Sequence, residues 1–153
     1  MLIYCYEPLR LSYEAAVPAF LHAIDNEQVR QILSRGVPEQ FADQAGEIGG
    51  RRNSTTVTVG TPTEEYGRVA IPIQCSTEDS SLISMVGEVT LSRLRPVLCH
   101  LSMSSSLTGM LARGLMYNRG LQMSVELAVA EFLDKLARLV IVRAGSGRQA
   151  RST

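Results

Sequence analysis

Two alternating segments and the long apolar stretch after them decide the fold: Leu82-Ile-Ser-Met-Val-Gly-Glu-Val-Thr-Leu-Ser92, Arg95-Pro-Val-Leu-Cys-His-Leu-Ser-Met-Ser-Ser105, and Leu107–Val142. In the first two, apolar side chains recur at every second position, which is typical of strands with one buried face. In the third, they recur every three or four positions, as in an amphipathic helix. This order predicts an antiparallel hairpin whose apolar face is covered by a long C-terminal helix.

The alternation extends upstream of these segments. Ser54–Val59 and Tyr66–Ser76 read as two further strands, and the links between consecutive strands are short enough for hairpins. Pro72 lies in the middle of the second of these strands, which favours an edge position or a bulge there. Leu2–Tyr6 is a candidate first strand, so we expect a curved antiparallel sheet.

Two short helices are expected between the first strand and the rest of the sheet. Ser12 precedes apolar residues at helical spacing and is a candidate N-cap, while Pro18 predicts a late start or a kink. Gln28–Leu33 is the second candidate, stopped by Gly36. The sequence therefore predicts an α+β, helix-grip fold, in which an antiparallel curved sheet wraps around the long C-terminal helix, with short helices after the first strand.

Length and composition indicate one soluble domain, since the chain has 153 residues, 45% of them hydrophobic and 20% charged. We expect the domain to span residues 1–142, with a disordered basic tail over residues 143–153, because Gly145 and Gly147 are expected to end the helix. The tail has three arginines and no acid, so the rest of this neutral chain carries a net charge of −3. That balance argues against nucleic-acid binding, and no apolar run is long enough to span a membrane. Three separated cysteines without a CxxC pair, and no visible signal peptide, predict reduced thiols in the cytoplasm.

Three motifs carry a resemblance to a known superfamily. They are Val57-Thr-Val-Gly-Thr-Pro62, Gly87-Glu-Val-Thr-Leu91 and Ala128-Val-Ala-Glu-Phe-Leu-Asp-Lys-Leu-Ala137. With the order of the elements, they resemble actinobacterial-type members of unassigned function in the START-like (SRPBCC) helix-grip superfamily, which includes polyketide cyclases and Bet v 1-like proteins. The resemblance covers most of residues 2–142 and implies a pocket between sheet and helix, but its motifs are patterns of packing rather than of chemistry.

The expected pocket lies between the sheet and the C-terminal helix. Near the start of that helix, Arg113 and Tyr117 are candidates for holding a polar head group, or else belong to a solvated first turn. The apolar residues expected to line the pocket are Val57, Val69, Ile71, Ile73, Met85, Val89, Val97, Leu101, Met103, Met123 and Leu127. An apolar cavity favours an apolar or amphipathic ligand. The alternative is that these side chains fill the core, as most apolar stripes do and as methionine does well.

No residue cluster indicates a reaction. The expected inward face contains no Asp, Glu or His, whereas general acid–base catalysis needs a titratable group within hydrogen-bond reach of the substrate. Cys99 and His100 are adjacent in a strand and so point to opposite faces, with His100 on the outer one. The two histidines and three cysteines lack the spacing of a ligand set, so we expect no metal site and no cofactor.

Three functions remain as hypotheses. The first is non-enzymatic binding of a small hydrophobic or amphipathic molecule in the cavity between sheet and C-terminal helix. The second is a structural or interaction protein with a filled core, acting through its sheet edge or as a homodimer. The third is a cyclase- or hydrolase-like enzyme, which the apolar inward face disfavours.

Overall fold

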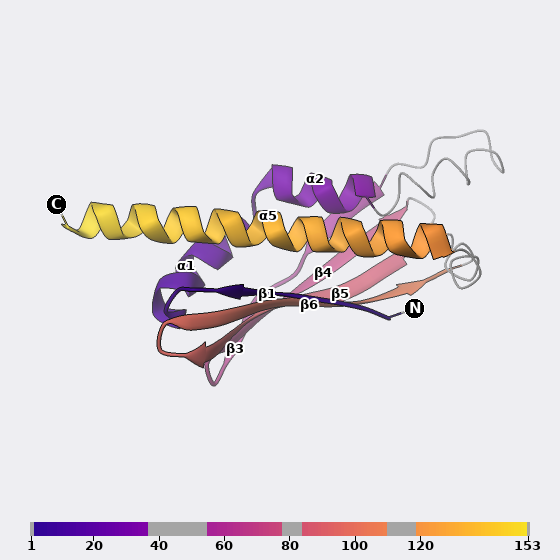
Figure 1. The fold of residues 1–153 in the computed structure, drawn as a ribbon. Helices are drawn as coiled ribbons and strands as arrows, with labels where there is room; N and C mark the ends of the chain where they lie inside the picture. The colour runs from indigo at the N-terminus through magenta and orange to yellow at the C-terminus, as the bar shows by residue number, and fades with distance from the viewer. Residues whose placement is uncertain (1, 37–54, 78–83, 110–118, 153) are drawn as a thin grey trace.

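The computed structural model describes residues 2–36, 55–77, 84–109 and 119–152. Within these residues, six antiparallel strands form one curved sheet, and three helices lie on one face of it (Figure 1). The strands are β1 (Leu2–Leu9), β2 (Thr55–Val59), β3 (Thr63–Glu65), β4 (Arg68–Thr77), β5 (Ser84–Arg95) and β6 (Leu98–Thr108), and the helices are α1 (Tyr13–Ala23), α2 (Glu27–Gly36) and α5 (Arg119–Ser152). The predicted α+β helix-grip fold class is therefore confirmed.

The sheet runs in the order β1-β6-β5-β4-β2, with β3 also paired to β4, so β1 forms one edge. Along its other side, β4 pairs with β3 over residues 68–70 and with β2 over residues 73–77. Pro72 lies between these two ladders, where the Gly60 N–H donates to the Pro72 carbonyl oxygen at 2.8 Å. Proline has no N–H to donate, and at this position neither the β3 ladder nor the β2 ladder needs one. Pro72 is therefore tolerated at a local break in the pairing of β4.

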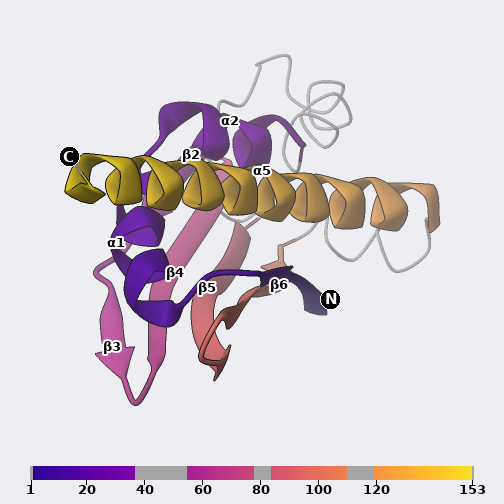
Figure 2. The same cartoon turned by 60° about the vertical axis from the view of Figure 1, so that its left-hand side comes forward.

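The apolar core fills the space between the sheet and the helices. The helix α5 packs against α1, α2 and β1, with α2 above it and α1 and β1 below it in Figure 2. The buried residues of α5 are Val125, Ala128, Val129, Phe132, Leu133, Leu136, Ala137, Val140 and Ala144. Because fully burying each large side chain contributes roughly 1.5–3 kcal/mol, this stripe fixes the rotation of α5 over the sheet.

The two short helices form close to where they were expected. The Ser12 hydroxyl accepts a hydrogen bond from the Ala15 N–H at 3.3 Å, which confirms the predicted N-cap. The helix α1 nevertheless starts directly after Ser12 and continues through Pro18, so the late start is wrong. The helix α2 begins at Glu27, after Asn26, whose side chain accepts from the Gln28 N–H at 2.9 Å.

The long helix differs from the expectation at both ends. Leu107 belongs to β6, and α5 begins at Arg119. It then runs to Ser152 and passes through Gly145 and Gly147, where the sequence predicted its end and a disordered tail. That predicted end is wrong, because a glycine costs a helix only about 1 kcal/mol relative to alanine and does not by itself stop it.

Candidate functional site

Most of the residues predicted to line a pocket lie in the packed core. Each of seven is at most 2% exposed: Val69, Ile71, Ile73, Met85, Val89, Leu101 and Met103. Val57 is half-buried and packs against the same cluster. The prediction of which strand face points inward was therefore correct, and these side chains fill the space between sheet and helix.

Three residues predicted to face inward are exposed instead. Val97 is 64% exposed because it lies in the turn between β5 and β6, one residue before β6 begins. Met123 and Leu127 are 58% and 66% exposed, because they lie on a flank of α5 outside its buried stripe. Arg113 and Tyr117, the predicted head-group residues, lie outside the described residues.

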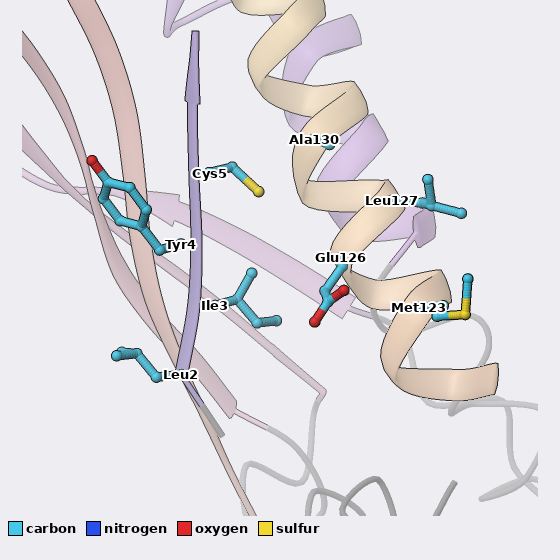
Figure 3. A pocket seen from close by; sticks show the side chains of 8 residues that line it. All are labelled: Leu2, Ile3, Tyr4, Cys5, Met123, Glu126, Leu127 and Ala130. Carbon is cyan, nitrogen blue, oxygen red and sulfur yellow. The ribbon is translucent and has the colours of Figure 1, made fainter. Parts of the chain in front are cut away.

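A groove of about 510 Å³ lies between β1 and the first half of α5 (Figure 3). Its lining residues are Leu2, Ile3, Tyr4, Cys5, Met123, Glu126, Leu127 and Ala130. Ile3 and Cys5 point from β1 toward the helix, and the Glu126 carboxylate points back toward β1. Met123 and Leu127 extend from the helix on the side away from β1 and form the rim. Of the predicted ligand-binding residues, only these two line the groove.

The position of β1 and the rotation of α5 produce this groove. Because β1 is an edge strand, no further strand of the described sheet lies beside it to fill the space under α5. Strand alternation turns Ile3 and Cys5 to the helix side of the sheet. On α5, the core takes one stripe of the helix, and residues 123, 127 and 130 form an adjacent row at i, i+4, i+7 spacing. The small side chain of Ala130 leaves room at the end of this row.

The groove is lined mainly by apolar side chains, together with one carboxylate. Glu126 is the single charged residue among the eight that line it. Within the described part of the chain, no ion pair or hydrogen bond engages its carboxylate. Burial, and secondarily the nearby Glu126 carboxylate, raise the pKa of the Cys5 thiol. Cys5 is therefore a protonated, weak nucleophile at neutral pH.

The sequence prediction missed six of the eight lining residues: Leu2, Ile3, Tyr4, Cys5, Glu126 and Ala130. An i, i+4, i+7 row containing Met123, Leu127 and Ala130 is visible in the sequence, but it was assigned to the interior. Its true position depends on which face of α5 the core takes, and that is decided by residues far away in the chain.

A second cluster of titratable side chains joins α1 to the sheet. The Tyr13 hydroxyl donates to Glu64 Oε1 at 3.3 Å, and the Arg93 guanidinium lies 5.0 Å from the centroid of the Tyr13 ring. Arg93 also forms an ion pair with Glu14. Burial, and then the Glu64 carboxylate, raise the pKa of Tyr13. Each side chain of this cluster contacts another member, so the cluster connects α1 to β3 and β5 and stabilises their packing.

The adjacent pair Cys99 and His100 does not form a reactive site. The buried Cys99 Sγ donates to the Leu11 carbonyl oxygen at 3.2 Å on the helix side of the sheet. The His100 ring lies on the outer face, 5.1 Å from the Tyr6 ring between centroids, which confirms the predicted orientation. The two side chains thus point to opposite faces and do not act on one substrate.

The described residues offer neither a metal-binding cluster nor a membrane-spanning helix. They contain no group of three or more His, Cys, Asp or Glu arranged to hold a metal ion. None of the helices in this part of the chain combines the length and the apolar character that a membrane crossing needs.

Comparisons with known proteins support the fold alone. No family model matches the chain, and no curated protein matches it in sequence. A hypothetical protein from Helicobacter pylori has a similar structure, with a TM-score of 0.53 at 8% identity, covering 90% of this chain and 86% of that one. A protein from Thermus thermophilus gives 0.43 at 11% identity, over 93% of this chain and 98% of its own. A protein from Chromobacterium violaceum gives 0.40 at 14% identity, over 91% and 96%.

Proposed function

We propose that the protein binds a small hydrophobic or amphipathic molecule, without chemical conversion, in the groove between β1 and α5. The observation that carries this proposal is the groove itself, whose volume of about 510 Å³ is in the range of small-molecule sites. The groove lies at the edge strand β1, beside the packed interior where the resemblance to the START-like superfamily implies a pocket. Membership of that superfamily and a cytoplasmic location stay predictions from the sequence.

The lining of the groove matches an amphipathic ligand. Ile3, Leu127 and Ala130 offer apolar surface, and transfer of an apolar ligand body from water to such a surface is favourable. Glu126 supplies one polar group, as is usual in sites where a few polar atoms orient the ligand. Cys5 has a raised pKa, so it is a poor nucleophile there, which supports binding over covalent chemistry.

Titration with Nile red, a neutral apolar dye, tests the proposal. The wild type should enhance the dye's fluorescence saturably. Ala130→Trp places a large ring against a lining position of the groove and should weaken dye binding at least tenfold. Glu131→Trp is the matched control, because Glu131 is the exposed next residue of α5 and does not line the groove.

Thermal unfolding must show that both tryptophan variants are as stable as the wild type. Equal dye binding by Ala130→Trp and Glu131→Trp would show that the groove is not the site. Absence of saturable binding to the wild type would remove the proposed function.

The second candidate function is association through the sheet edge, as an interaction protein or a homodimer. The observation favouring it is the exposed apolar surface of Leu2, Tyr4 and Tyr6 on the edge strand β1. Native mass spectrometry separates the two candidates, since a bound small molecule adds a small mass and a homodimer doubles the chain mass. A dimer that Tyr4→Lys dissociates would favour the edge, and a wild-type monomer without dimer at any concentration would exclude self-association.

A further inference from the structure

We infer that the molecule held in the groove carries a cationic head group that donates hydrogen bonds, such as a primary ammonium, attached to an apolar body. This inference rests on the proposed function and adds the chemical class of the ligand. Three observations support it: the position of Glu126, its lack of a partner among the described residues, and the apolar character of the surfaces around it.

Binding of a ligand changes the hydration of the Glu126 carboxylate. In the empty groove, Glu126 is exposed and bonded to water, so its charge costs nothing. A ligand body lying against Ile3 and Ala130 displaces part of that water. A carboxylate that loses water without gaining a partner is destabilised, and a neutral or anionic ligand offers no compensation. An ammonium group replaces the lost water with charge-assisted hydrogen bonds.

No basic side chain among the described lining residues balances the charge of Glu126. The lining contains no lysine or arginine to neutralise Glu126 or to hold an anionic head group. The nearest basic residue toward the start of α5 is Arg119, seven residues from Glu126 and therefore roughly 10 Å away along the helix. Burial is the main cause of the raised pKa of the Cys5 thiol, and the nearby Glu126 carboxylate adds to it. Among the residues that line the groove, Glu126 is thus an unneutralised negative charge, which favours a cationic head group.

A set of three single-chain amphiphiles with the same tail tests the inference: decylammonium, decanol and decanoate. Each amphiphile competes with Nile red for the groove of the wild type, and the loss of dye fluorescence on titration reports its affinity. At low salt, decylammonium should bind about tenfold more tightly than decanol, and decanoate more weakly than either.

In the same competition assay, Glu126→Gln should remove the preference for decylammonium. Glu131→Gln, the matched loss of an exposed carboxylate on α5, should retain it. A preference that survives in Glu126→Gln would overturn the inference, because the head group would then lie elsewhere. Equal binding of all three amphiphiles, blocked by Ala130→Trp, would also overturn it but leave the proposed function intact. Binding of none of them would refute both.

Discussion

Gly87→Ala and Gly145→Ala should change the stability of the protein in opposite directions. At Gly87, in β5, an added Cβ would lie 2.6 Å from the Ser104 carbonyl oxygen and 2.8 Å from Ser105 Cβ on β6. Both distances are shorter than ordinary contacts, and one atom is backbone, so the two strands must separate. Overpacking of this kind costs about 1–3 kcal/mol. At Gly145 there is no heavy atom within 4 Å of the added Cβ.

The expected gain at Gly145 comes from the helix backbone. Gly145 lies inside α5, and alanine is about 1 kcal/mol more favourable than glycine in a helix interior. For a chain of this length, each kcal/mol shifts the melting temperature by about 2–4 °C. Thermal unfolding followed by circular dichroism should therefore show a clear decrease for Gly87→Ala and an increase of about 2–4 °C for Gly145→Ala.

Two results would refute this reasoning. A neutral Gly87→Ala would mean that β5 and β6 do not approach each other as the register Gly87↔Ser105 requires. An unchanged melting temperature and helix content for Gly145→Ala would mean that α5 ends before Gly145, as the sequence alone predicted.

Three further predictions concern single residues. Tyr66 is fully exposed and has a φ of 44°, which is unfavourable for a bulky side chain. Tyr66→Asn should therefore raise the free energy of unfolding, measured by urea titration, by about 1 kcal/mol. A lower free energy of unfolding would show that the ring has a packing role. Burial raises the pKa of Cys75 from 9.0 to about 12, so the unfolded thiol ionises first and this contribution to stability is lost as the pH rises from about 9 to about 12. Urea titrations across that range should show a smaller loss for Cys75→Val, and parallel losses would contradict the assignment. Ser12→Ala should cost about 1 kcal/mol and Ser12→Asp should cost much less, whereas equal costs for both would exclude capping by this side chain.

The sequence predicted the fold because local patterns carry it. Alternation along β4, β5 and β6 specified the buried face, and the side chains of Ile71, Val89 and Leu101 lie where that alternation puts them. The N-cap at Ser12 was equally local, since it depends on a hydroxyl and an amide three residues apart. The error at Val97 was also local, because β6 begins at Leu98 whereas the strand was predicted from Arg95, and Val97 therefore lies in the turn.

The groove could not be predicted in the same way, because it depends on long-range packing. The row of Met123 and Leu127 is as regular in the sequence as the row of Val125 and Phe132, and each could have faced the sheet. Packing of α5 against α1 and α2 selects the second row and leaves the first on the side of β1. Only the strand order shows that this side is an open edge of the described sheet.

The groove therefore brings together the first strand and the beginning of the last helix of the described chain, since β1 begins at Leu2 and α5 begins at Arg119. Neither wall is a binding site alone: β1 supplies Ile3 and Cys5, and α5 supplies Glu126 and Ala130. A ligand that contacts both walls binds only the folded chain, so its binding free energy adds to the stability of the docked helix. The core itself is already filled by residues such as Phe132, which keeps α5 in place when the groove is empty. Because the groove lies outside the packed core, the protein can bind a ligand there without an internal cavity, which would lower its stability.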